Sequence, residues 1–282
     1  MICVEARVPL HLSIVWVPVE TGDPRSTGSL GAGLMLEPGV RARACSTPGG
    51  YRGPRLPTVT RCLEALGWRG ELVEVETSYP PGYGLGVSGA AALAACLAYA
   101  GLRGVGSVRA ADEAHVAEVL ERTGLGDVTA LYTAWGLEVR LKPGAPGAGG
   151  YAEAHPVHEL PVAAVPVTRL DTGVMLREMW SRVSRGEAVR VYERVRSEPS
   201  LETLGEAARV FTMRATPPPP EAVELLRYCT RRALLAVYKK GSVVIVAEDE
   251  ESLEAFEGCA RGRGFQAYRL RLSNTRPYTT IL

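Results

Sequence analysis

Hydrophobic and polar positions in the first half of the chain follow both strand-like and helix-like spacings. Residues 1–9 and 71–78 alternate between apolar and polar side chains, which is typical of half-buried strands. An apolar run at residues 14–19 follows the first of these strands. The pattern predicts a short helix over residues 56–68 and a further strand over residues 139–141.

The second half of the chain has a different pattern, in which longer predicted helices alternate with strands. The pattern predicts strands at 160–167, 242–247 and 265–272, and helices at 173–196, 201–213, 221–238 and 250–263. The four prolines at 217–220 break the chain and preset the start of helix 221–238. Such an alternation indicates an α/β plait.

Between these strands, an Ala/Leu-rich run without charge or proline follows a loop that contains Gly82, Gly84, Gly86 and Gly89. The run is a strong helix former. Glycines let backbone N–H groups approach a ligand closely, and the start of a helix carries partial positive charge. A glycine loop that leads into a helix is therefore an anion site, typically for phosphate. Residues 85–102 are also the membrane-span candidate, but weakly apolar alanines and interrupting glycines favour a buried helix.

Two other interpretations of this loop remain. It could be a tight turn before a buried helix. It also satisfies G-x-G-x-x-G through Gly84, Gly86 and Gly89. A dinucleotide site of that kind needs a βαβ unit and an acidic residue about 20 positions further on. Residues 101–115 predict a loop and then a helix, which does not match.

The next predicted helix covers residues 108–122, with Ser107 at its start. Asp112, His115 and Glu118 are spaced at i, i+3 and i+6, so they share one face. The helix stops at Gly124-Leu-Gly126, and Asp127 opens the following helix. Plainer interpretations exist: Asp127 as an N-cap, Glu118 as a solvated charge, and His115 as a surface or core histidine.

Residues 22–36 contain more glycine and serine than a hairpin needs. They suit either a solvated loop or a carboxylate pocket, in which Arg25 forms a bidentate clamp. Hydroxyl groups would come from Ser26, Thr27 and Ser29. Arg140, flanked by apolar residues in a predicted strand, is either an outward charge or a second cation.

Composition narrows the function classes. The chain has 282 residues, enough for one large or two ordinary domains, with 32 Lys+Arg against 31 Asp+Glu. A net charge of +1 gives no reason to expect nucleic acid or a membrane surface. Asn274 and Gln266 are the only side-chain amides, which hints at a thermophile. The first residues lack the pattern of a signal peptide, so we expect a cytoplasmic protein.

The six cysteines have no metal-ligand spacing. Reduced, mostly buried thiols are the default expectation, although a hyperthermophilic host would leave a structural disulfide open. The sequence also leaves the oligomeric state open, a homodimer included.

Residues 80–91 resemble the phosphate loop of the GHMP kinases, roughly P-x-x-x-G-L-G-S-S-A. Val87 and Gly89 depart from that motif. The order of phosphate loop, Glu-bearing helix and G-x-G-D also matches the family. The resemblance implies an α+β, two-domain fold, with an N-terminal mixed α/β ATP-binding domain (1–153), a C-terminal ferredoxin-like plait (154–282) and a site in the cleft between them. Lys239-Lys240-Gly241-Ser242 stands where the family has a third, glycine-rich loop.

Roles follow from the resemblance position by position. It implies Mg²⁺ ligation by Ser88 and Glu118, and Asp127 as the catalytic carboxylate. The implied contacts to the ATP phosphates are Gly84, Leu85, Gly86, Val87, Ser88, Gly89 and Ala90.

Within this superfamily, the chain looks most like the archaeal pantoate kinases of coenzyme A biosynthesis. Pro9, His11 and Ser13 carry the first part of that pattern, followed by D-P-x-x-x-G-S-x-G-A-G from Asp23 and by G-L-x-V-R-x-K-P-G around Arg140. The likeness implies ATP-dependent phosphorylation of the primary hydroxyl of D-pantoate to 4-phosphopantoate. Its implied substrate contacts are Arg25, Ser26, Ser29, His115 and Arg140. A kinase for another hydroxy acid or alcohol, or a non-catalytic metabolite sensor, remains an alternative.

Overall fold

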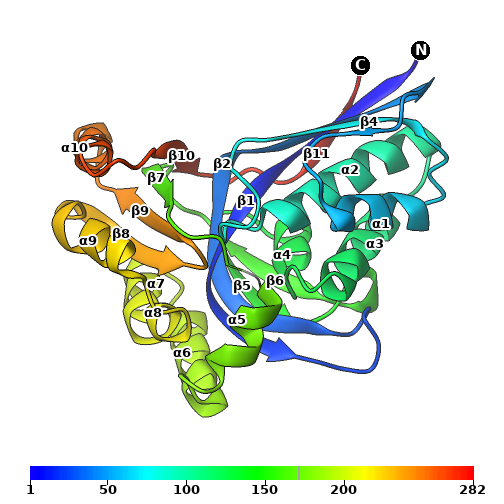
Figure 1. Ribbon diagram of the computed structural model, residues 1–282. Helices are drawn as coiled ribbons and strands as arrows, with labels where there is room; N and C mark the ends of the chain where they lie inside the picture. The colour runs from blue at the N-terminus through cyan, green and yellow to red at the C-terminus, as the bar shows by residue number, and fades with distance from the viewer. Residues whose placement is uncertain (171) are drawn as a thin grey trace.

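A computed structural model describes residues 1–170 and 172–282 (Figure 1). The described residues form an 11-stranded sheet whose main path runs β11-β1-β2-β10-β7-β9-β8. Its centre is the antiparallel pair β1 (Cys3–Val19) and β2 (Gly28–Pro48), interrupted by bulges near Pro9 and Ile14. The predicted strand 1–9 and the apolar run 14–19 are thus one strand. Of the expected pocket segment 22–36, all residues from Gly28 onward belong to β2.

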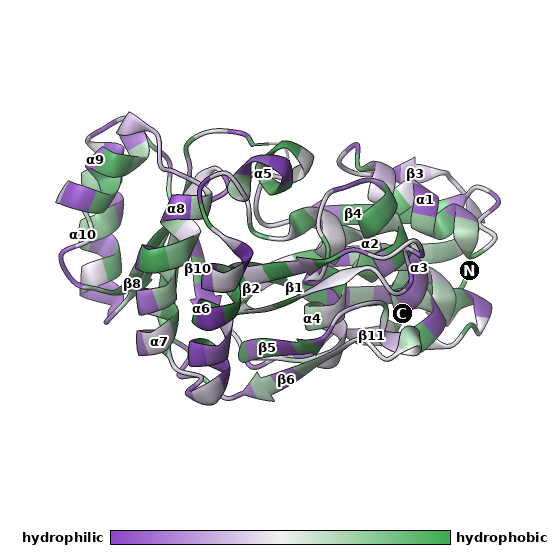
Figure 2. Ribbon diagram, turned by 90° about the horizontal axis from the view of Figure 1, so that it is seen from below, coloured by the Kyte–Doolittle hydropathy of each residue, from purple (hydrophilic) through white to green (hydrophobic). Residues whose placement is uncertain are grey.

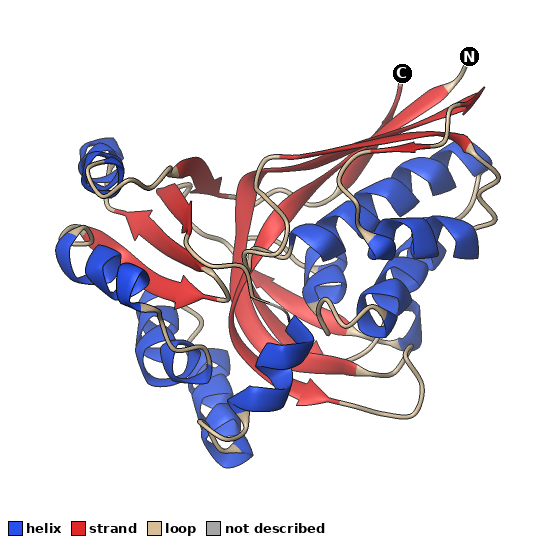
Figure 3. Cartoon of the chain, viewed as in Figure 1, coloured by secondary structure: helices blue, strands red, loops and turns tan. Residues whose placement is uncertain are grey.

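In the N-terminal half, two further pairs of strands extend the sheet from opposite ends of β2. One end of β2 pairs with β4 (Glu71–Thr77), which also pairs with β3 (Tyr51–Arg52). The other end pairs with β5 (Leu137–Lys142), which continues to β6 (Tyr151–His155). Figures 1 and 3 show the helices of this half gathered on one side of these strands; they are α1 (Pro57–Ala65), α2 (Val87–Arg103), α3 (Ser107–Leu120) and α4 (Asp127–Thr133), with a 3₁₀ turn η1 (Pro146–Ala148).

Helix α2 is the buried helix of the structure. Every residue from Gly89 to Ala100 is buried, because small Ala side chains let α2 lie close to β1 and β2 while α1 and α3 flank it. Figure 2 shows the apolar colouring along this helix and the strands beneath it. The membrane-span candidate is therefore a core helix, and within the described chain no helix has the length and apolarity to cross a bilayer.

The C-terminal half is the expected plait. Its strands are β7 (Pro161–Pro166), β8 (Ala233–Lys239), β9 (Ser242–Ala247) and β10 (Tyr268–Leu272), and they lie in the order β10-β7-β9-β8 with antiparallel neighbours. Numbered within this half, the order is 4-1-3-2 for a β-α-β-β-α-β chain, which confirms a ferredoxin-like plait. The helical segments are α5 (Thr172–Met179), α6 (Arg185–Ser197), α7 (Leu201–Ala207), the π turn η2 (Ala208–Thr212), α8 (Met213–Ala215), α9 (Pro220–Tyr228) and α10 (Glu250–Arg261).

The predicted helix 221–238 is wrong in its second half. Helix α9 ends at Tyr228, and residues 233–239 form β8 instead. Leu235 and Val237 are buried while Leu234 is half exposed, so this apolar run has a strand's alternation that a helical pattern can mask. The predicted helix 173–196 is likewise two helices. Ser184 starts the second with a capping box to Glu187.

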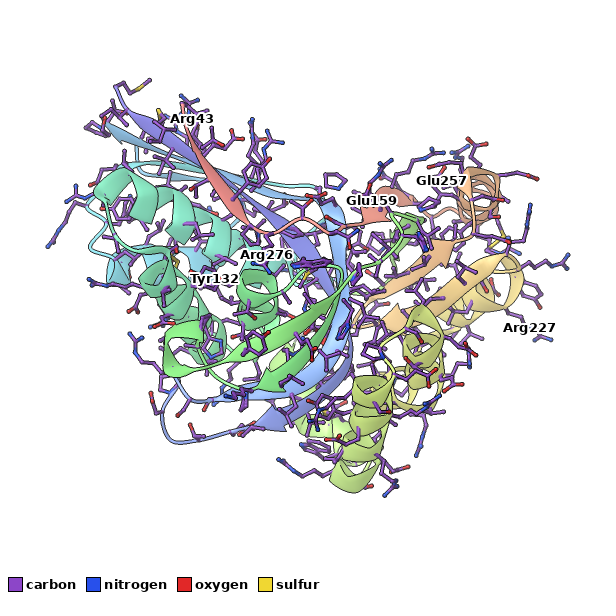
Figure 4. The ribbon with its side chains drawn as sticks, turned by 180° about the vertical axis from the view of Figure 1, so that it is seen from behind. Arg43, Tyr132, Glu159, Arg227, Glu257 and Arg276 are labelled. Atoms are coloured by element: carbon purple, nitrogen blue, oxygen red, sulfur yellow. A yellow bond between two sulfur atoms is a disulfide. The ribbon has the colours of Figure 1, made fainter. Side chains whose placement is uncertain are left out.

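The two halves share one continuous sheet. Strand β10 pairs with both β2 and β7, and the last strand, β11 (Tyr278–Ile281), returns to pair with β1. One hydrophobic core extends through both halves, and a second, smaller core lies between the plait strands and helices α9 and α10. Charged side chains such as Arg227 lie on the outer side of these helices (Figure 4). The domain boundary at 153/154 stays a prediction.

All six cysteines are paired, as Cys3–Cys45, Cys62–Cys96 and Cys229–Cys259. The expectation of reduced thiols is therefore wrong for this structure. The pairs could not be predicted from the spacing of the cysteines, because each pair joins two elements that are neighbours in space but far apart in sequence. The first joins β1 to β2, the second α1 to α2, and the third the end of α9 to α10.

The Cys229–Cys259 pair closes a 30-residue separation beside the smaller core. Replacing both residues by serine should lower the free energy of unfolding by about 2–4 kcal/mol, because the unfolded chain gains freedom. Denaturant titration of the two proteins measures this. Alkylation of Cys229 or Cys259 in the denatured, unreduced protein would contradict the pairing.

Candidate active site

A cleft of about 570 Å³ lies between the two halves of the chain. Its walls come from the loop before α2, the loop between α3 and α4, and strands β1 and β5 of the N-terminal half, together with the β8–β9 turn of the C-terminal half. A concave site of this size suits a small molecule.

The loop before α2 forms one end of the cleft. Gly86 is the N-cap of α2 with φ 62°, a left-handed conformation that favours glycine. The main-chain N–H of His11 donates to the Leu85 carbonyl at 3.2 Å, which ties the loop to β1. Because the first amides of a helix have no intrahelical partner, the start of α2 offers donors to an anion. Of the predicted phosphate contacts, Gly84, Gly86, Val87, Ser88 and Gly89 line the cleft, while Leu85 and Ala90 are buried behind it.

Glu118 of α3 and Asp127 of α4 meet at this helix start. A methyl group on Gly89 would lie 2.9 Å from Glu118 Oε1 and 3.2 Å from Asp127 Cβ. Glu118 Oε2 accepts a hydrogen bond from Val128 N at 3.3 Å, whereas the buried Oε1 has no partner. Burial, and then the charge of Asp127, raise the pKa of Glu118 well above its usual value.

This orphaned oxygen fits a divalent cation, which would relieve both effects. Mg²⁺ typically takes one or two protein ligands and completes its shell with water and substrate phosphates. Within residues 1–170 and 172–282, no three or more His, Cys, Asp or Glu side chains are grouped so that they could hold a metal ion.

Asp127 is held by a buried chain of charged groups. His11 Nδ1 donates to Asp127 Oδ1 at 2.7 Å, and His11 Nε2 donates to Glu138 Oε1 at 2.9 Å. Burial disfavours charge on His11, but its hydrogen bonds to Asp127 and Glu138 outweigh burial and raise the pKa of His11 above its usual value. Burial likewise disfavours the charge of Asp127, but the His11 hydrogen bond and nearby cations lower the pKa of Asp127 to about 2.

The chain of charges continues to Arg140 on β5. Arg140 Nη1 donates to Glu138 at 2.6 Å, and Nη2 donates to Ser13 Oγ at 2.9 Å and to the Val15 carbonyl at 3.0 Å. Its buried Nε has no partner and lies where a methyl group on Gly126 would be 3.2 Å away. Arg140 is one of the residues that line the cleft, and Glu138 balances its charge.

Three predicted substrate contacts lie outside this cleft. Arg25 is 45% exposed and pairs with Glu113 at 2.6 Å and Asp112 at 3.4 Å. Ser26 is exposed on the same β1–β2 connection and bonds Thr21.

His115 is buried, with Nε2 at 2.8 Å from the Thr27 carbonyl, and burial lowers its pKa. Arg25 and His115 thus join the β1–β2 connection to α3, whereas Ser26 bonds within that connection. Their contact with a substrate stays a prediction. Ser29 and Arg140 do line the cleft.

Comparison with known proteins agrees with this geometry. Residues 56–134 match the model of the GHMP kinases N-terminal domain. A pantoate kinase from Thermococcus kodakarensis is 31% identical, over 88% of this chain and 89% of its own length. The chain belongs to the GHMP kinase family.

Solved structures extend the likeness of this GHMP kinase. A phosphotransferase related to the coenzyme A biosynthesis pathway superposes with a TM-score of 0.82 and 27% identity, covering 99% of this chain and 98% of the other. A mevalonate-3-kinase from Thermoplasma acidophilum, with mevalonate 3-phosphate and ADP bound, gives a TM-score of 0.65 at 11% identity, covering 99% and 98%. The second likeness shows the fold alone.

Neither the pairing of His11 with Glu138 nor the place of Lys239 in the cleft wall was predicted from the sequence of this GHMP kinase. His11 stood in the P-x-H-x-S pattern, but nothing in the spacing linked it to Glu138, 127 residues later. The alternation of β5 was the only available signal, since it puts Glu138 and Arg140 on the same face.

His11→Leu should lower the free energy of unfolding of this GHMP kinase by about 3–5 kcal/mol, because two carboxylates lose the cation between them. Chemical denaturation measures the effect. His158→Leu, at an exposed histidine, is the matched control and should change the free energy by less than about 0.5 kcal/mol. Equal effects of the two substitutions would contradict the buried charge chain.

Proposed function

We propose that this chain transfers the γ-phosphoryl group of ATP to the primary hydroxyl of D-pantoate, giving 4-phosphopantoate and ADP. One observation carries the proposal. Glu118 and Asp127 both lie against the amide-rich start of α2, and Asp127 lines the cleft there, so donors for an anion, a candidate cation ligand and a candidate hydroxyl-orienting carboxylate meet at one place. The 31% identity with a pantoate kinase over most of both chains supports pantoate as the acceptor.

Positioning and charge neutralisation dominate phosphoryl transfer, and the cleft is suited to both. The amides of residues 84–89 would hold the ATP phosphates. Ser88 and Glu118 would hold Mg²⁺, which when bound neutralises phosphate charge. Glu118 is suited to this because its buried oxygen is without a partner.

Asp127 would orient the acceptor hydroxyl. A carboxylate whose pKa is about 2 is a weak base, so it accepts a hydrogen bond from the hydroxyl first. The hydroxyl oxygen then bonds to the γ-phosphorus as the bond to ADP breaks, and the proton passes to Asp127 as the hydroxyl becomes acidic. His11 keeps the carboxylate aimed throughout, since Glu138 fixes its other nitrogen.

The acid end of the substrate would lie toward β1 and β5. Ser29 and Arg140 line this side of the cleft, together with Ser13 and Trp16. Ser29 and Arg140 therefore remain proposed substrate contacts, Arg140 through its unpartnered Nε.

A coupled assay of ADP release tests the substrate. With ATP and Mg²⁺, we expect turnover with D-pantoate and kcat/KM at least about tenfold lower with homoserine, mevalonate or shikimate, because each fits the acid end differently. Preference for one of the other three would identify a different GHMP kinase. ATP binding without ADP release for any acceptor would indicate a metabolite sensor.

Asp127→Asn should lower kcat by about 10²–10⁴-fold and leave the KM values for ATP and pantoate within a few-fold, since the amide keeps the size but does not take the proton. Steady-state kinetics with both substrates varied measure this. Near-normal turnover would remove Asp127 from the catalytic role.

A further inference from the structure

Lys239 is the last residue of β8, where the chain turns into β9 beside the phosphate loop. A methyl group on Gly84 would lie 2.4 Å from the Lys239 carbonyl, and Ser242 Oγ donates to the Tyr83 carbonyl at 2.6 Å. The β8–β9 turn is therefore fixed against the loop. The side chain of Lys239 points into the cleft that this contact helps to close.

The Lys239 ammonium is nearly enclosed, with the residue 5% exposed. Its Nζ lies 3.2 Å from the centre of the Trp16 ring, a cation–π contact. Trp16 is fixed in turn, by a hydrogen bond from Nε1 to Met179 and by the edge of Phe211. Within residues 1–170 and 172–282, the Lys239 ammonium has no hydrogen bond or ion pair.

The three charged groups that act on Lys239, namely Lys240, Asp127 and Arg140, have partners of their own. Glu138 balances Arg140, His11 holds Asp127, and Lys240 Nζ donates to the Thr123 carbonyl at 3.4 Å. Burial, and then the charge of Lys240, lower the pKa of Lys239 well below its usual value. An enclosed cation in this setting is stabilised when an anion binds beside it.

The sheet register places this ammonium at the acid end of the cleft. Trp16 pairs with Gly31, which pairs with Arg140 on its other side, so Trp16 and Arg140 lie in one row on the same face of the sheet. The row lies on β1, β2 and β5, whereas the phosphate donors belong to the start of α2. A carboxylate beside this row is therefore the anion that fits Lys239 better than an ATP phosphate.

We propose that Lys239 binds the carboxylate of the acceptor acid, which makes it a specificity residue for hydroxy acids over neutral alcohols. The inference rests on the proposed function. It also assigns a role to the sequence that replaces the family's glycine-rich third loop. Arg140 then supplies one further N–H donor, while the net positive charge comes from the C-terminal half.

Lys239→Met tests the inference, because it keeps an unbranched chain and removes the charge. We expect the KM for pantoate to rise about 10–100-fold, as for loss of a close charge pair, while the KM for ATP changes less than about threefold. Lys142→Met is the matched control at an exposed lysine and should leave both values unchanged. Lys239→Arg should recover part of the loss because it keeps the charge.

A neutral substrate gives a test that is independent of any variant. Wild-type enzyme should phosphorylate pantoamide, in which an amide replaces the carboxylate, with kcat/KM about 10–100-fold below that for pantoate. Lys239→Met should use the two substrates about equally. Equal use by the wild type, or an unchanged KM for pantoate in Lys239→Met, overturns the inference.

Failure of the proposed function gives a different result, namely no ADP release by the wild type with pantoate. In that case the acid that the panel identifies is compared with its own amide. If no acid in the panel is turned over, calorimetric titration of pantoate into wild type and Lys239→Met decides. Equal affinities, or no binding to either protein, overturn the inference, and loss of binding in the variant alone supports it.

Discussion

The cleft depends on a chain of largely buried charged groups, balanced in sign, that runs from β5 through His11 of β1 to the start of α4. Asp127, His11, Glu138 and Arg140 alternate in sign along one line of hydrogen bonds, so each group offsets the desolvation of the next. Glycine at position 31 is part of the same constraint, because a methyl group there would lie 2.0 Å from Arg140 Nη2. The line of hydrogen bonds holds the Asp127 carboxylate on a rigid support.

The charged side chains near the cleft differ in whether they have a partner of opposite charge. Cations at the interior of the sheet are matched by carboxylates and serve geometry. Lys239, brought in from the plait, is left with an aromatic face and no counter-charge among the described residues. Glu118 is the acidic counterpart, because its buried Oε1 accepts no hydrogen bond. A buried charged group without a partner lowers the stability of the fold. A ligand that brings an anion to Lys239 and a cation to Glu118 would remove both costs at once.

The sequence predicted the parts of the structure whose signals are local. The glycine loop and the helix α2 that follows it are predicted by glycine and alanine content over about 20 residues, and the plait is predicted by the order of its elements. The contacts of Arg25 could not be predicted, because its partners lie 87 and 88 residues away on α3. The same holds for His11 with Glu138, which depends on the register of three strands. The helix predicted through residues 233–238 was wrong for another reason, since a short apolar run is compatible with both a helix and a strand.

The continuous sheet has a consequence for how this chain can be divided. Strands β10 and β11, encoded at the end of the sequence, cover edges of β2 and β1, which are encoded at its start. A fragment ending at residue 153 would leave those edges unpaired and open to association with other chains. The N-terminal half therefore relies on β10 and β11, from the far part of the sequence, to cover two of its strand edges.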